Sequence, residues 1–200
     1  MSNADSLLIT PPDWLIAYAR ETAPLVSIEA RMSRVIGAAR ENITRGDGGP
    51  FAAGVFERDS GKLVALGVNM VATAGLSVLH AEIMALSLAQ KKLGSFDLGG
   101  EGLAAHDLVT SAAPCAMCLG AVPWSGVTRL IAGARGEDVE AVGFDEGAKP
   151  ADWERTLTAR GIEVVGDVLR AEAAAVLRDY AERGGQIYNP AHFKRPYGGE

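Results

Sequence analysis

A hairpin pattern followed by alternating strand and helix patterns limits this chain to a small group of folds. Two apolar runs, residues 51–57 and 63–70, flank a polar turn and predict a β-hairpin. The segments expected after it are a helix over 79–93, a strand over 108–110, a helix over 115–122, a strand over 129–134, a helix over 152–160, a strand over 162–165 and a helix over 170–183. Such alternation favours helices packed on a mixed sheet, either a two-layer α/β fold or an α/β/α sandwich.

The two ends of the chain differ from this central pattern. Residues 1–45 are expected to form an N-terminal helical extension, in which Pro24 separates two helices and the second covers 28–43. Residues 184–200 form a tail with little helical or strand periodicity. Because 200 residues suit one compact core, we expect a single domain over 1–200.

Charge and hydropathy exclude two classes of partner. The formal net charge is −6, with only short basic clusters, whereas a nucleic-acid binder usually shows a basic surplus. No stretch approaches the roughly 20 apolar residues of a membrane helix, and the N-terminus lacks a signal-peptide pattern. We therefore expect a small-molecule substrate, no nucleic-acid partner, no membrane association and a cytoplasmic location.

Three residues form a candidate metal site. Cys115 and Cys118 are the only cysteines, and their spacing of one helical turn allows both sulfur atoms to face one ion. His80 begins a predicted helix, and no fourth protein ligand is evident. A zinc ion with three protein ligands leaves a position for water, whose pKa it lowers to about 7. Glu82, two residues past His80, is then placed to carry protons without binding the metal.

Each of these residues also has a purely structural interpretation. The two cysteines are compatible with small buried residues or a redox pair. His80 is compatible with a helix cap, and Glu82 with an acid in the first helical turn that interacts with the helix dipole. The combination of both motifs favours the metal site.

The segments His80-Ala81-Glu82 and Pro114-Cys115-Ala116-Met117-Cys118 match the H-x-E and P-C-x-x-C signature of zinc deaminases. Over residues 51–134 the chain resembles the cytidine and deoxycytidylate deaminase-like superfamily, which includes cytosine, guanine and tRNA adenosine deaminases. The resemblance implies a three-layer α/β/α sandwich with a mixed five-stranded sheet. It also implies Zn²⁺ bound by the histidine and the two cysteines, with Glu82 as the catalytic acid and base.

The resemblance extends to residues that bind the substrate. In the superfamily an asparagine ahead of the H-x-E helix hydrogen-bonds the ring, and Asn69 matches it. We assign Phe51, Trp124 and Ala81 to the same pocket, the two aromatic rings as its walls. A turn asparagine and core aromatic residues remain the structural alternatives.

Guanine deaminases of this superfamily carry a second carboxylate that protonates the leaving amine. Glu146, in Phe144-Asp145-Glu146-Gly147, is the candidate here, with a solvated acidic loop as the alternative. In those enzymes the C-terminal segment closes over a pocket, and the tail of this chain contains the aromatic residues Tyr188, Phe193 and Tyr197.

The resemblance therefore implies an aminohydrolase of cyclic amidines that converts guanine to xanthine and ammonia, forms a homodimer and also accepts related amino-triazines. Two alternatives stay open. One is a tRNA adenosine or cytosine/cytidine-type deaminase, and the other is a non-catalytic zinc-binding structural module.

Overall fold

The computed structural model describes residues 7–20 and 23–189. Its elements in chain order are α1 (Asp13–Arg20), α2 (Ile28–Arg45), β1 (Ala52–Glu57), β2 (Leu63–Val68), α3 (Val71–Ala74), α4 (Ala81–Leu93), β3 (His106–Ala112), α5 (Ala116–Ser125), β4 (Arg129–Ala134), α6 (Gly136–Ala141), α7 (Trp153–Thr158), β5 (Glu163–Val165) and α8 (Arg170–Glu182). Every helix and strand expected from periodicity is present, and the short helices α3 and α6 are additional.

The sheet is mixed and has the strand order β2-β1-β3-β4-β5. β1 runs antiparallel to both β2 and β3, whereas β3, β4 and β5 are parallel. The register places Leu108 opposite Leu130 and Val109 opposite Ile131. The expected mixed five-stranded sheet is confirmed.

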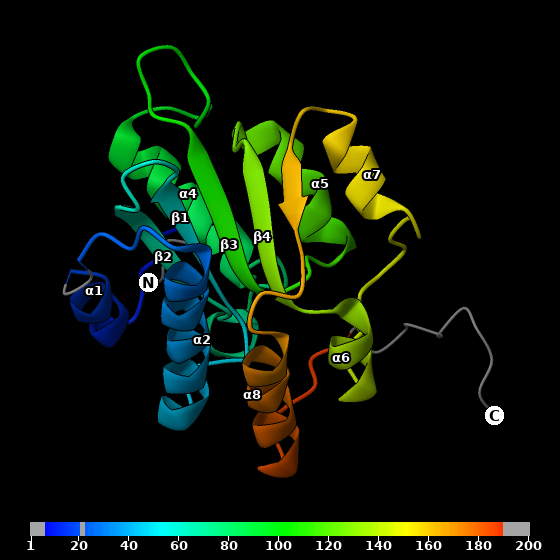
Figure 1. The fold of residues 1–200 in the computed structure, drawn as a ribbon. Helices are drawn as coiled ribbons and strands as arrows, with labels where there is room; N and C mark the ends of the chain where they lie inside the picture. The colour runs from blue at the N-terminus through cyan, green and yellow to red at the C-terminus, as the bar shows by residue number, and fades with distance from the viewer. Residues whose placement is uncertain (1–6, 21–22, 190–200) are drawn as a thin grey trace.

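Two apolar clusters, one on each face of the sheet, form the core. Successive strand residues point to opposite faces, so Leu108 and Leu130 join one cluster while Val109 and Ile131 join the other. Helices α2 and α8 cover the face of Val109, and α4, α5 and α7 cover the opposite face (Figure 1). This arrangement is the three-layer α/β/α sandwich that the resemblance implied.

Helix α2 is part of this sandwich and differs from the appended helix that we expected. Its apolar face is fully buried against the sheet, and its Arg31 is also buried. The Nη1 atom of Arg31 donates to Asp107 at 2.5 Å, and Arg129 Nη2 donates to the same carboxylate at 2.6 Å. Arg31 also donates to the carbonyl oxygens of Leu25 and Arg58. This buried network ties α2 to the amino ends of β3 and β4.

Helix α4 lies very close to β2 because Gly67 has no side chain. A Cβ atom at residue 67 would lie 2.4 Å from the carbonyl oxygen of Ala81 and 2.5 Å from the backbone nitrogen of Ala85. Real Cβ atoms do not approach backbone atoms this closely, so the glycine permits the observed distance between helix and strand. The start of α4 is thereby held against the hairpin.

Within the described residues, no helix is long and apolar enough to span a membrane.

Candidate active site

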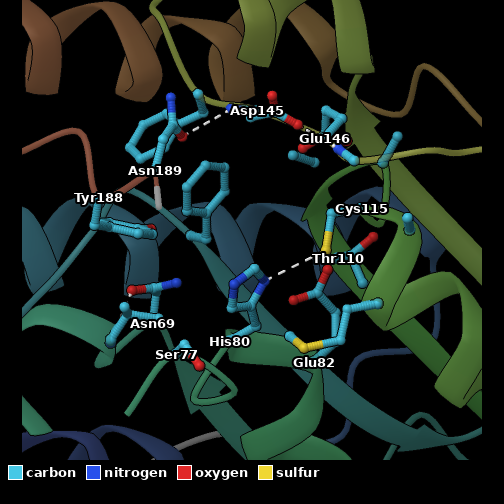
Figure 2. A pocket seen from close by; sticks show the side chains of 18 of the residues that line it. Asn69, Ser77, His80, Glu82, Thr110, Cys115, Asp145, Glu146, Tyr188 and Asn189 are labelled. Atoms are coloured by element: carbon cyan, nitrogen blue, oxygen red, sulfur yellow. Dashed lines mark hydrogen bonds between the residues drawn. The ribbon is translucent and has the colours of Figure 1, made fainter. Parts of the chain in front are cut away.

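A cavity of about 460 Å³ lies beside the carboxyl end of β3. Its volume is within the range of roughly 300–1,000 Å³ found for small-molecule sites. In α/β sheets, ligands bind outside the carboxyl ends of parallel strands. The polar residues of its lining are Asn69, Ser77, His80, Glu82, Thr110, Ser111, Cys115, Asp145, Glu146, Tyr188 and Asn189. Figure 2 shows most of them surrounding this space from several sides.

The three predicted metal ligands come together at the starts of two helices. His80 and Cys115 are the N-cap residues of α4 and α5, and neither side chain makes a capping hydrogen bond. Cys118 lies further along α5 and is fully buried. Their ligand atoms all lie within 4.8 Å of one another. His80 therefore does not cap its helix through its side chain, and the imidazole is directed at the thiols.

The spacing and chemistry of these ligands fit zinc. The Sγ atom of Cys115 and the Nδ1 atom of His80 are 3.5 Å apart. Tetrahedral zinc, with Zn–S of about 2.3 Å and Zn–N of about 2.0 Å, separates two such ligands by about 3.5 Å.

The two thiols share one hydrogen bond and differ in their readiness to ionise. A hydrogen bond from Cys118 lowers the pKa of Cys115 to about 4, and the same hydrogen bond raises the pKa of Cys118. One thiol of the pair therefore ionises readily and the other does not. Zinc deprotonates the thiols that it binds, so a bound ion would make both residues thiolates.

Glu82 lies in the first turn of α4 and lines the cavity. Its side chain is only 8% exposed, and burial raises the pKa of its carboxyl group. A buried carboxyl group beside a reacting ring can take up and deliver a proton. Its position beside the metal ligands supports the proton-carrying role predicted for it.

Glu146 reaches the same cavity from the loop between α6 and α7. Its side chain is 8% exposed, so the alternative of a solvated acidic residue is wrong. Burial raises the pKa of Glu146 to about 7, although the nearby Lys149 lowers it. Two buried carboxyl groups from different elements thus line one cavity.

Asn69 and Phe51 line the cavity as expected. The Oδ1 atom of Asn69 accepts a hydrogen bond from the backbone nitrogen of Val71, at 3.2 Å, and its Nδ2 atom has no partner among the described residues. The ring of Phe51 meets that of Phe144 edge to face, with centroids 5.0 Å apart. A free amide donor and an aromatic wall are suited to a flat polar ring.

Trp124 and Ala81 were assigned to the pocket, and the structure places their side chains elsewhere. α5 buries Val122 and Ser125 against the core, so Trp124 lies on the opposite side of the helix and is 85% exposed. Ala81 is fully buried and packs with its carbonyl group against Gly67. Neither residue lines the cavity in this chain, contrary to the expectation for Trp124.

The described part of the tail reaches the cavity within the same chain. Tyr188 and Asn189 line it, and the ring of Tyr188 lies 5.0 Å from that of Phe144. The hydroxyl group of Tyr188 is buried and has no hydrogen-bond partner among the described residues. Phe193 and Tyr197 lie outside those residues.

Asn189 and Lys149 are polar residues of this region that the sequence did not single out. The side chain of Asn189 accepts from the backbone nitrogen of Asp145 at 3.0 Å and donates to the carbonyl of Gly143 at 2.9 Å. Lys149 bonds to Glu146 at 3.0 Å. The sequence could have indicated only the contact of Lys149 with Glu146, because these residues are three positions apart.

An α/β/α sandwich in which two helix starts present one imidazole and two thiols beside buried carboxyl groups defines a zinc hydrolase of the deaminase type. Residues 26–134 match the family model described as the cytidine and deoxycytidylate deaminase zinc-binding region. The chain therefore belongs to this deaminase family, and the match includes α2.

Individual relatives are guanine deaminases. The guanine deaminase of Bacillus subtilis (strain 168) is 36% identical over 135 residues, which cover 64% of this chain and 81% of that protein. The solved structure of the guanine deaminase from Nitrosomonas europaea is 53% identical, with a TM-score of 0.86 over 89% of this chain and 97% of that one. The structure of NE0047 in complex with 2,6-diaminopurine is 54% identical, with a TM-score of 0.88 over 92% of this chain and 97% of that one.

Proposed function

We propose that this protein is a zinc-dependent guanine deaminase, which hydrolyses guanine to xanthine and ammonia. The observation that carries the proposal is the convergence of the metal ligands and two buried carboxyl groups on one aromatic-walled cavity. Guanine deaminases that are similar over nearly their whole length support this choice of ring.

Zinc would be held by His80, Cys115 and Cys118, and it would supply the Lewis acid that activates water at neutral pH. Glu82 lines the cavity beside the ligands, so its carboxylate would accept a proton from the attacking water and deliver it to the ring. Glu146 would give a proton to the departing amine, which is a poor leaving group until it is protonated. As the C–N bond breaks and ammonia leaves, the hydroxyl group on the ring carbon becomes the carbonyl of xanthine, and its proton returns to Glu146. Two carboxyl groups thus divide the proton transfers.

Ring binding is assigned to Asn69 and Phe51. The free Nδ2 group of Asn69 donates to a ring acceptor, and guanine offers O6, N3 and N7. The edge of Phe51, fixed by Phe144, packs against the base. The same contacts suit related amino-triazines, which share the polar edge of guanine.

Ammonia release from a panel of substrates tests the proposal. Guanine should react faster than guanosine, cytidine or a tRNA anticodon hairpin, since ribose adds bulk and the net charge of −6 repels a phosphate chain. Equal or faster reaction of the hairpin would assign the chain to tRNA adenosine deamination. A fully occupied zinc site without ammonia release from any substrate would indicate a structural module.

Several wider assignments complete the proposal. A homodimer is supported by exposed apolar residues on α5, Met117 and Trp124, and on the adjacent loop, Phe96. Sedimentation of the wild type and of Trp124→Glu tests this surface, and the variant should dissociate. A cytoplasmic location suits a site that requires reduced thiols. We also assign residues 1–200 to a single domain.

A further inference from the structure

Lys149 occupies a partly buried position between two parts of the site. Its Nζ atom lies 3.0 Å from Oε2 of Glu146 and 3.0 Å from the carbonyl oxygen of Pro114. Pro114 immediately precedes the metal ligand Cys115. The Lys149 side chain is 13% exposed, and its Nζ lies 5.5 Å from the centroid of the Trp153 ring. One ammonium group therefore joins the loop that carries Glu146 to the chain that leads into α5.

The carboxylate of Glu146 depends on this contact for its orientation. The loop from 142 to 152 contains no helix or strand. Its backbone is held at Glu146, whose carbonyl oxygen accepts from Ala116 at 2.8 Å, and at Asp145, which bonds to Asn189. Among the described residues, Lys149 alone donates a hydrogen bond to the Glu146 carboxylate. Without it, no hydrogen bond from the described residues would fix the orientation of this carboxylate.

We propose that Lys149 is a positioning residue for the deamination reaction, which holds the Glu146 carboxylate in a fixed orientation and at a fixed place relative to the Cys115 end of α5. The inference rests on the proposed function, because it concerns the geometry of a proton donor for the leaving amine. Lys149 itself transfers no proton and does not contact the substrate. A displacement of about 1 Å in a catalytic group can reduce the rate roughly 100-fold.

The proposal differs from a general role of Lys149 in stability. A buried lysine that only neutralised a buried carboxylate would affect folding and zinc retention, and removing it would leave its partner unpaired. A positioning residue affects kcat through Glu146 and leaves the affinity for guanine nearly unchanged. The two roles therefore predict different kinetic patterns, which a double-mutant cycle separates.

The test compares the wild type with K149M, K149R, E146Q and the double variant E146Q/K149M, using guanine as the substrate. K91M is the matched control, since Lys91 is an exposed residue on α4. We expect K149M to lower kcat about 10- to 100-fold with KM within about threefold, and K149R to restore part of the loss. Adding K149M to E146Q should cause no further loss. Zinc content should equal that of the wild type throughout.

Three results would overturn the inference: full activity of K149M, an equal loss of kcat when K149M is added to E146Q, or a change confined to KM. If K149M does not fold, K149R provides the same test. The inference then requires that K149R lowers kcat in the otherwise wild-type enzyme and causes no further loss of kcat when it is combined with E146Q. A wild type that releases no ammonia from guanine would instead refute the proposed function.

Discussion

The two ends of the parallel strands both contain buried charge, and they treat it differently. At the amino ends of β3 and β4, the single carboxylate of Asp107 is bonded by Arg31 and Arg129 at 2.5 and 2.6 Å. At the carboxyl ends, the carboxyl groups of Glu82 and Glu146 are both 8% exposed, and the cavity region supplies one lysine. Among the described side chains, positive charge is in surplus at the first end and scarce at the second, where the proposed zinc ion would add to it.

This difference separates a stabilising network from a reactive one. A fully paired buried charge holds elements together, and removal of one partner is costly. A buried acid with too few partners has a raised pKa and readily takes up or loses a proton near neutrality. The comparison therefore predicts that substitutions at one end change mainly stability and those at the other end change mainly rate.

Glu82→Gln should produce the largest effect. The amide keeps the shape of the side chain and cannot carry protons, so we expect kcat for guanine to fall by about 10²–10⁴-fold. Elemental analysis should find wild-type zinc, and the unfolding temperature should not decrease. Activity within a few-fold of the wild type would move the proton transfer to another group, and loss of zinc would give Glu82 a role in metal binding.

Asp107→Ala should give the largest loss of stability. Removing it leaves Arg31 as an unpaired buried charge, which typically costs about 3–5 kcal/mol in the free energy of unfolding. Urea denaturation measures this loss, and kcat of the folded fraction should be unchanged. Glu163→Gln is the control, since Glu163 pairs with Arg58 at the same end but is 49% exposed, and it should cost at most about 1 kcal/mol. Similar losses for both variants would contradict the comparison.

A chain that ends after Gly185 should show a smaller effect, on substrate binding. It loses Tyr188 from the cavity wall and the two hydrogen bonds of Asn189 that hold the loop next to Glu146. We expect KM for guanine to rise about tenfold, equivalent to about 1.4 kcal/mol. A folded truncated chain with unchanged KM and kcat would show that the tail only packs on the domain.

The last prediction concerns stability at the site end, as a pH-dependent difference between the wild type and Glu146→Gln. Burial raises the pKa of Glu146 from its ordinary 4.5 to about 7, so between these values the folded protein retains a proton that the unfolded chain releases. The stability of the wild type should therefore fall relative to the variant as the pH rises from about 4.5 to about 7, and then stay level. Urea denaturation of chelator-treated protein at several pH values measures this, and a constant difference would contradict it.

Local patterns in the sequence were sufficient for the order of helices and strands and for the candidate metal ligands, whereas the three layers were implied by the family resemblance. Apolar periodicity predicts β4 with its observed ends, and the spacing of Cys115 and Cys118 is a property of one helical turn. The assignment of Trp124 to the cavity wall failed because packing on the sheet and on α4 decides which side of α5 is buried. Arg31 and Asp107 are 76 positions apart, and Asn189 and Asp145 are 44 apart, so no local pattern relates them. Contacts between residues so far apart in the sequence can be identified only from the folded structure.

Because α4 approaches β2 closely at Gly67, a change in the packing of the hairpin should change the affinity of the site for zinc. A methyl group at residue 67 would meet the backbone at Ala81 and Ala85, and α4 would have to retreat. His80 and Glu82 lie at the start of that helix. A shift of α4 would therefore move His80 away from the two cysteines and would displace Glu82 at the same time. A laboratory selection for new ring substrates would therefore find few tolerated changes at residue 67, although this residue is absent from the cavity wall.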